Sequence, residues 1–201
     1  MTTVANPPYS EFGISEFISR VGAKGYFAKR NRYTVEITPP SGLLSDPNIT
    51  DTPDPANIQF LIKAVSLPAR TSGTSTFRYG GKYGMEVPYE VTPSEGVSIT
   101  FLETDQWQCR KFWYNWLQYI QNTDSYNMTY YDKFKGGLKI SIYNDTQVEA
   151  MNPMHRVELI NVWPKGMSAV ELGWENAELL DFTVDLVFKK WEIVYVKIIL
   201  L

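Results

Sequence analysis

The sequence has few of the side chains that most often do chemistry. It contains one cysteine, Cys109, and one histidine, His155, among 201 residues. A single cysteine excludes an internal disulfide, and the two residues together leave almost nothing for a zinc site. Cys109 also lies on the apolar stripe of a predicted helix, far in sequence from His155, which argues against a Cys/His nucleophilic pair. We predict no catalytic residue, no metal ligand and no cofactor.

Charge is also scarce. Charged residues make up 20% of the chain, the formal net charge is −3 and the sequence pI is about 5.3. This balance does not favour the tight binding of nucleic acid that counterion release gives to basic proteins. A low content of charge is typical of a protein whose surface is largely covered by partners.

Long hydrophobic runs are missing. The longest apolar stretch runs from Ile193 to Leu201, but Lys197 interrupts it and it is too short to cross a bilayer. The first residues, Met1 to Pro8, have neither the basic nor the apolar region of a signal peptide. We therefore expect no membrane anchor, and we interpret the last residues as a terminal strand or as an extension that is covered in an assembly.

What the sequence does contain is a series of short β-patterns. Alternating or β-prone segments bounded by proline, glycine or polar turns predict strands at 33–38, 58–67, 75–79, 85–91, 97–102, 138–143, 156–163 and 181–188, the last running on through Trp191. The pair at 75–91 has a glycine-rich tip and predicts a hairpin. Proline and aspartate crowd into residues 41–57, which predicts a long surface loop.

Two segments have helical spacing. Residues 10–21 read as a short amphipathic helix, and residues 105–121 as the one long helix, with Thr104 or Asp105 at its N-cap. A chain of this length and pattern predicts one domain over residues 1–201. The fold class we predict is mainly β: an antiparallel β-barrel or sandwich with one flanking α-helix and a short N-terminal helix.

Other candidate sites have more ordinary explanations. The carboxylate pairs Glu171 with Glu175 and Glu178 with Asp181 lie in turn-like polar sequence, without the pattern of a glycosidase. Gly80-Gly81-Lys82 lacks the spacing and the following helix of a phosphate loop. A basic and aromatic cluster has the composition of a site for single-stranded nucleic acid, but a charged connection between a helix and a strand is the favoured interpretation. The cluster comprises Lys24, Tyr26, Phe27, Lys29, Arg30, Arg32 and Tyr33.

Read in order, the chain resembles the tail tube protein family of contractile-tailed bacteriophages, whose relatives include the tube proteins of phage-derived injection systems. The resemblance covers the chain from about Tyr9 to Trp191. It rests on the strings FAKRNRYTVEI, FLIKAVSLPAR, FRYGGKYGMEVPYEVTPSEGVSITFLETD, QCRKFWYNWLQYI, KISIYND and VELINVWPKGMSAVELGWENAELLDFTVDLVFKKWEI.

The resemblance implies a structural virion protein of the contractile tail, assembled in the host cytoplasm. Six copies would form a ring, and the rings would stack into a tube inside a sheath. Expected partners are copies of the chain itself, the tail sheath protein, baseplate and tail terminator proteins, and phage DNA that passes through the lumen without specific binding. The hairpin tip would lie near the contacts between rings, through Gly80, Gly81, Lys82, Tyr83 and Gly84.

Two alternatives stay open. A baseplate protein that initiates the tube, or the tube protein of an injection system, would share the same fold with different neighbours, and the length of segment 41–57 is a feature that a baseplate or terminator relative could explain. A more remote alternative is a glycan-binding β-sandwich with Tyr79, Tyr83 and Tyr89 as an aromatic platform. An enzyme is the least favoured class.

Overall fold

The computed structural model describes residues 27–46, 49, 51–78, 80, 83–93, 96–143, 153–174 and 178–194, together with Ile14, Ile18, Ser19 and Gly22. Most of the helix predicted at 10–21 lies outside these residues. The strands are β1 (Tyr33–Thr38), β2 (Ile62–Val65), β3 (Arg70–Phe77), β4 (Met85–Pro93), β5 (Val97–Leu102), β6 (Gly136–Ile142), β7 (His155–Met167), β8 (Asp181–Val187) and β9 (Lys190–Val194). The helices are α2 (Ser41–Ser45), α3 (Pro55–Ile58), the 3-10 helix η2 (Gln59–Leu61), α4 (Gln108–Ile120) and α5 (Tyr131–Phe134).

Seven strands form one antiparallel sheet in the order β1-β6-β7-β8-β5-β2, and β9 pairs with β7 beside this path. β7 joins the two halves: its first residues pair with β6 and β9, and its last residues pair with β8. The mainly antiparallel β fold predicted from the sequence is confirmed, but the sheet is not closed into a barrel. β1 and β2, the two ends of the path, are not paired with each other.

β7 changes its partners at an irregular point. The register with β6 shifts between Ile160 and Val162, and Asn161 between them has φ 57°. Asparagine tolerates this left-handed conformation better than most residues and is suited to a bulge that bends a strand. We predicted that the strand would end at Pro164; it continues to Met167, with a second register shift between Pro164 and Gly166 where proline cannot donate a ladder hydrogen bond.

Helix α4 closes the core, and it is shorter than the predicted 105–121. Neither Thr104 nor Asp105 caps it: the N-cap is Trp107, in the left-handed conformation at φ 55° and without a side-chain hydrogen bond. Glu103 supplies the acceptor instead, since its carboxylate accepts the backbone N–H of Cys109 at 3.1 Å and of Arg110 at 2.7 Å. A carboxylate at this end of a helix satisfies free N–H groups and complements the helix dipole.

The core is aromatic where α4 meets the sheet. Trp113 stacks on Trp116 with ring centroids 5.4 Å apart, and Phe101 of β5 lies 5.5 Å from Trp113. The Trp116 indole N–H donates to the Phe134 carbonyl at 3.0 Å, which ties α4 to α5. The inner faces of the strands complete this core with Val35, Ile37, Val97, Ile99, Leu138, Ile140, Val157, Leu159, Phe182, Val184 and Leu186.

The sequence predicts a surface loop over residues 41–57, but part of this segment is helical. It contains α2 and the start of α3, and it places Leu43 and Ile58 fully inside the core. The strand predicted at 58–67 is correspondingly short, because residues up to Leu61 are helical and only Ile62–Val65 pair with β5. Apolar runs of this length do not by themselves separate buried helix from buried strand.

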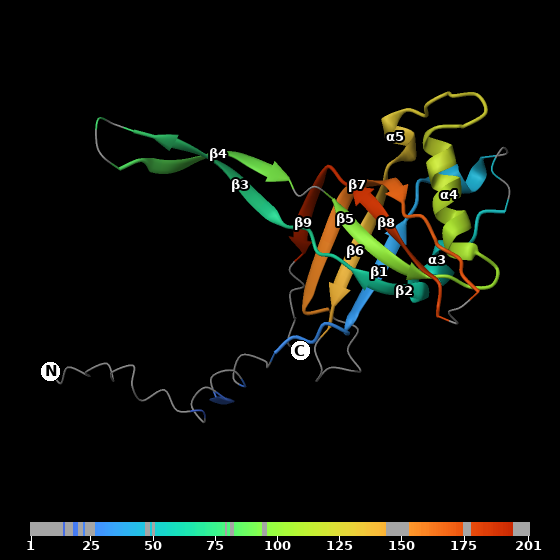
Figure 1. Ribbon diagram of the computed structural model, residues 1–201, viewed down its shortest axis with the longest axis horizontal. Helices are drawn as coiled ribbons and strands as arrows, with labels where there is room; N and C mark the ends of the chain where they lie inside the picture. The colour runs from blue at the N-terminus through green and yellow to red at the C-terminus, as the bar shows by residue number, and fades with distance from the viewer. Residues whose placement is uncertain are drawn as a thin grey trace, which may run out of the picture.

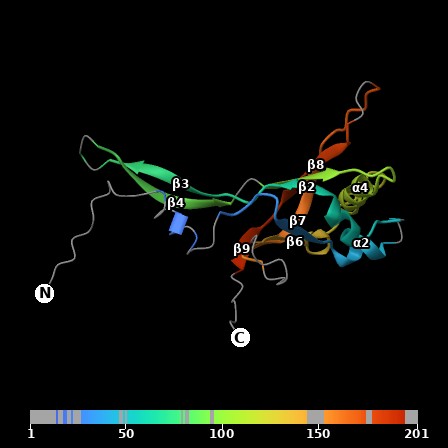
Figure 2. The same ribbon diagram turned by 90° about the horizontal axis from the view of Figure 1, so that it is seen from below.

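β3 and β4 form a separate two-stranded sheet. Both views show this hairpin standing out from the body of the molecule, while α4 lies on the opposite side of the sheets (Figures 1 and 2). The hairpin is longer than the predicted 75–91, because β3 begins at Arg70 and β4 runs to Pro93.

Candidate assembly surfaces

The β3–β4 hairpin, hereafter the arm, has two chemically different faces. The register pairs Phe77 with Met85 and Ser75 with Val87, so these four side chains share one face. The other face carries polar pairs such as Thr76 with Glu86. The register pairs Gly73 with Glu90 and Thr74 with Pro88, so the shift leaves Tyr89 without a register partner. The Tyr89 ring lies over Gly73, on the same face as Ser75 and Phe77, which places the tyrosine on the apolar face.

Within the described part of the chain, this apolar face is uncovered. Phe77 is 47% exposed, Met85 59% and Tyr89 67%. An isolated two-stranded hairpin is marginally stable in water, and exposed apolar patches of this kind mark sites of association. The arm therefore has the composition of a surface that is buried by another molecule.

The tip of the arm holds the five residues predicted to contact another ring. Gly80 has φ 56°, and Tyr83 is 88% exposed. A β-carbon on Gly84 would come within 2.7 Å of Thr76 Cγ2 on the facing strand. Gly81 and Lys82 lie outside the described residues. The structure thus places Gly80, Tyr83 and Gly84 at the end of the arm, and their role in a ring contact stays a prediction.

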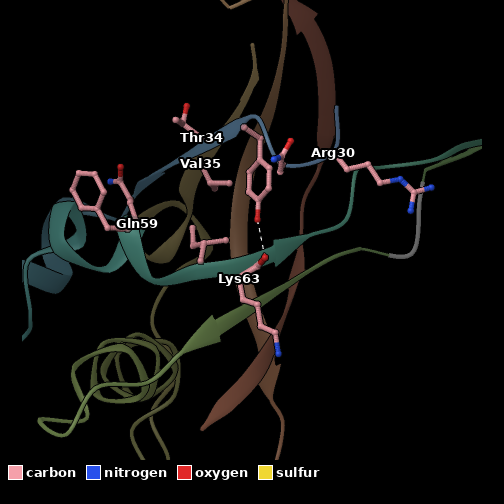
Figure 3. Close-up of a pocket in the computed structure, with 9 residues that line it drawn as sticks. Arg30, Thr34, Val35, Gln59 and Lys63 are labelled. Atoms are coloured by element: carbon pink, nitrogen blue, oxygen red, sulfur yellow. Dashed lines mark hydrogen bonds between the residues drawn. The ribbon is translucent and has the colours of Figure 1, made fainter. Parts of the chain in front are cut away.

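A second surface is the open seam between β1 and β2. The Tyr33 hydroxyl of β1 donates to the Lys63 carbonyl of β2 at 2.9 Å and bridges the two unpaired edges. Figure 3 shows this hydrogen bond, with Arg30 and Thr34 on one side of the hollow and Gln59 and Lys63 on the other. The hollow has a volume of about 660 Å³, and burial raises the pKa of the Tyr33 phenol. The seam is therefore a groove with backbone hydrogen-bonding groups at both rims.

A second hollow of about 450 Å³ continues the seam past Tyr33. Its apolar floor comes from β2, β6 and the segment after β2, through Val65, Leu67, Ile140 and Ile142. Lys29, Arg30 and Arg32 line the same hollow. These are the described cations of the basic cluster that the sequence singled out, whereas Lys24 and Tyr26 lie outside the described residues.

A third surface is the outward face of β1, β6, β7 and β9. The registers align Glu36, Lys139, Glu158 and Glu192 in one row across the four strands. Lys139 Nζ lies 3.7 Å from Glu36 Oε2, and Lys190 pairs with Glu192 at 2.6 Å. This face carries charges of both signs, and the row itself holds three carboxylates and one lysine.

The residues considered for chemistry are not brought together as a site. Cys109 is fully buried on α4, and burial, with the nearby Glu103 carboxylate, raises the pKa of its thiol to about 12. His155 begins β7. Asp181 forms an ion pair with Lys63, and Glu175 lies outside the described residues. Within the described ranges, no three His, Cys, Asp or Glu side chains are close enough to hold a metal ion.

Sequence reasoning missed two features that depend on tertiary structure. The seam forms because β1 and β2, 24 residues or more apart in the chain, end the sheet path without pairing, which no local pattern reveals. The loop between β7 and β8 exposes Trp174 completely, at 104%. The signal available in the sequence was a tryptophan beside a glycine in a polar stretch.

Among the described residues, no helix is long and apolar enough to cross a membrane.

Comparison with known structures supports the same architecture. A chain from the sheath–tube complex of an extracellular contractile injection system (PVC) in the extended state superposes with a TM-score of 0.56 at 14% identity, over 89% of this chain and 97% of that one. A chain of the anti-feeding prophage (AFP) baseplate gives 0.58 at 16% identity, over 87% and 99%. A chain of the AFP tube-terminating cap gives 0.58 at 14% identity, over 85% and 93%. At these identities the likeness concerns the fold.

No curated protein sequence matches the chain. A family model described as phage tail tube protein does match it, over residues 28–194. The matched range includes every strand from β1 to β9, the arm and helix α4. The resemblance inferred from the sequence is thereby confirmed, and the chain belongs to the phage tail tube protein family.

Proposed function

We propose that this chain is a non-enzymatic subunit of a hexameric ring, and that the rings stack into the inner tube of a contractile tail. The observation that carries the proposal is the arm: a separate hairpin that projects from the body with Phe77, Met85 and Tyr89 exposed on one face. Such a face is stabilised when a neighbouring copy covers it. The tip residues Gly80, Gly81, Lys82, Tyr83 and Gly84 would then reach the next ring.

The sheet edges support ring formation. Among the described residues, β1, β2 and β9 each pair with a strand along one edge only. Unpaired edges invite the addition of a strand from another molecule, and a closed ring hides them without a separate cap. In the ring, the sheets of neighbouring copies would join into a continuous inner wall.

The outward face of β1, β6, β7 and β9 suits that wall. Its cations lie beside carboxylates, as in the pairs Lys139 with Glu36 and Lys190 with Glu192. Phosphates of DNA would find few cations without a neighbouring carboxylate, so that DNA would pass through the lumen without being held. Genome delivery into the host is the task that follows from such a wall.

The other partners follow from the family and from the similar structures. Those structures are described as parts of a sheath–tube complex, a baseplate and a tube-terminating cap. We infer that this subunit contacts a sheath protein along the tube and baseplate and terminator proteins at its ends, as a virion component assembled in the host cytoplasm. A cap or baseplate position is the second candidate, because the TM-scores for cap, baseplate and tube, 0.58, 0.58 and 0.56, do not separate them.

Negative-stain electron microscopy over a concentration series, with size-exclusion chromatography beside it, tests the proposal. We expect six-fold rings or hollow tubes from the unmodified protein. Phe77→Lys should leave the protein monomeric with an unchanged melting temperature, because it places a charge on the apolar face of the arm. Thr76→Lys, on the opposite face of the same strand, is the matched control and should still assemble.

The tip can be tested separately. Gly80→Val places a β-branched residue at φ 56°, where L side chains are strained, with no neighbouring atom within 4 Å to clash. Rings that no longer stack would agree with a tip in the contact between rings. Tubes of unchanged length and yield would contradict that role. A protein that stays monomeric at every concentration would instead point to a junction subunit that needs a template.

A further inference from the structure

The described residues of the loop between β7 and β8, 168–174 and 178–180, present large apolar side chains to water. Leu172 is 76% exposed, Trp174 104% and Leu179 81%. Figure 2 shows the segment extending away from the sheets, where no other described element covers it. Tryptophan is the side chain most enriched among residues that dominate binding energy, so such a tip is costly unless it is buried in an assembly.

The base of this loop is held in place. The Ser168 N–H donates to the Thr183 carbonyl at 2.8 Å, and Arg110 Nη1 donates to the Ser168 carbonyl at 3.3 Å. At the other end, the Glu103 N–H donates to the Leu180 carbonyl at 2.9 Å. A loop with a fixed base loses less conformational freedom on binding than a free segment does. Both ends of the loop are therefore fixed to the body of the molecule.

The loop tip is also acidic at its margins. Glu171 and Glu178 are both exposed; they flank Leu172 and Trp174, and Leu179 follows Glu178. The second hollow of the seam has the complementary composition, with an apolar floor that includes Val65, Leu67 and Ile142 and with cations at its rim. Its volume of about 450 Å³ lies in the range of pockets that hold small ligands, about 300–1,000 Å³, which is sufficient for an indole ring.

We infer that the β7–β8 loop of one copy docks into this basic, apolar hollow on a neighbouring copy, with Trp174 as the buried anchor and Glu171 and Glu178 facing the cations at the rim. The inference rests on the proposed self-assembly and names two of the surfaces that meet. Charge of opposite sign around two apolar surfaces favours this partner and orients the encounter. The β7–β8 loop and the hollow lie on different parts of the same chain, so the contact is heterologous. Such a contact forms a closed ring when the rotation from each copy to the next adds up to a full turn.

The β7–β8 loop cannot dock into the hollow of its own molecule. The end of the loop is fixed at Asp181, which pairs with Lys63 near the start of β2. The hollow lies beyond the other end of β2, at Val65 and Leu67. From that base the loop extends away from β2 (Figure 2).

Charge reversal tests the pairing. We expect Glu171→Lys with Glu178→Lys to raise the concentration needed for assembly at least tenfold, and Arg30→Glu to do the same. Combining the three changes should restore assembly most of the way, because opposite charges then face each other again. Asp124→Lys, an exposed reversal in the connection between α4 and α5, is the matched control and should have no effect.

Cysteine cross-linking tests the contact directly. Two single variants, Leu172→Cys and Leu67→Cys, are purified separately, mixed and oxidised. We expect a disulfide-linked heterodimer from the mixture and no disulfide-linked dimer from either variant alone. The native Cys109 is buried and does not interfere. The proteins are compared by circular dichroism beforehand, so that a folding defect is recognised.

The outcomes separate this inference from the proposed function. If the unmodified protein forms tubes but the reversed charges have no effect and no heterodimer forms, the docking inference is wrong and the tube remains. If the unmodified protein does not assemble at any concentration, the tube subunit is ruled out in favour of the junction subunit, and the cysteine mixture still decides the contact: a heterodimer supports it and its absence overturns it.

Discussion

The aromatic ring of Tyr89 in β4 lies against Gly73 in β3, so closely that a β-carbon on Gly73 would come within 3.3 Å of Tyr89 Cε1. The two residues meet at the bulge of the arm, where the register shifts between Gly73 and Thr74. An aromatic ring over a glycine in the facing strand shields a backbone that would otherwise be solvated. This contact helps to keep an otherwise unsupported hairpin in one conformation.

Gly73→Val should therefore weaken assembly without unfolding the body. The branched side chain would displace the Tyr89 ring and cost the hairpin roughly 1 kcal/mol of cross-strand stabilisation. We expect fewer and shorter assemblies in electron micrographs at equal concentration, with a melting temperature close to that of the unmodified protein. A fall in melting temperature as large as that of a core variant would show that the arm is part of the main cooperative unit instead.

Glu103 should be important for the stability of α4. Its carboxylate accepts hydrogen bonds from the backbone N–H groups of Thr104, Cys109 and Arg110. Glu103→Ala should lower the free energy of unfolding by about 1–2 kcal/mol, in the range measured for lost helix caps. Glu103→Gln should lower it less, because the amide oxygen still accepts. Urea unfolding followed by tryptophan fluorescence measures both, with the exposed arm variant Glu86→Ala as the control.

Local patterns predicted much of the sheet. The alternation of Val97–Leu102 gave β5 with its observed bounds, and the strand beginning at Asp181 became β8. The start of α4 was misplaced because the cap comes from Glu103, outside the window in which N-cap residues are normally sought. Pro164 predicts a strand end, although the bulge before Gly166 lets β7 continue. These errors arise where a distant partner overrides the local signal.

The candidate surfaces were less predictable. The hairpin and its glycines were visible in the sequence, and Gly80 does adopt a positive φ. The openness of the sheet was not visible, because it depends on whether β1 and β2 pair across the fold. Likewise, the exposure of Trp174 depends on what the folded chain leaves uncovered. Properties of this kind belong to the whole structure and have no period or spacing in the sequence.

Cys109 should be unreactive in the folded protein. Burial, reinforced by the Glu103 carboxylate, raises the pKa of the thiol to about 12, so that the thiolate is a minute fraction at pH 8. Because the neutral thiol is the form favoured in the folded state, this group gives no loss of stability as the pH falls. Destabilisation from its ionisation should start only as the pH rises above the pKa of the unfolded thiol.

Alkylation with iodoacetamide at pH 8, followed by mass spectrometry, checks this prediction. We expect labelling in urea and almost none in buffer over the same time. Labelling in buffer at the rate found in urea would mean that α4 opens readily, since solvent does not otherwise reach Cys109.

Gly136 and Gly166 should respond in opposite ways to an added methyl group. A β-carbon on Gly136 would come within 2.5 Å of the Thr38 carbonyl oxygen and 2.7 Å of Trp116 Cη2, one a backbone atom and the other part of the buried indole stack. Neither can move without separating β6 from β1 or shifting α4. Gly136→Ala should therefore lower the free energy of unfolding by about 1–3 kcal/mol, as overpacking of a core does.

Gly166 is the matched control, since a β-carbon there meets no atom within 4 Å. Gly166→Ala should be neutral or should stabilise the protein by about 0.4–1 kcal/mol, because alanine restricts the unfolded chain more than glycine does. Denaturant titration of the two variants beside the unmodified protein measures the difference. Equal unfolding midpoints for both would mean that β6 does not approach β1 and α4 as closely as the packing of Trp116 requires.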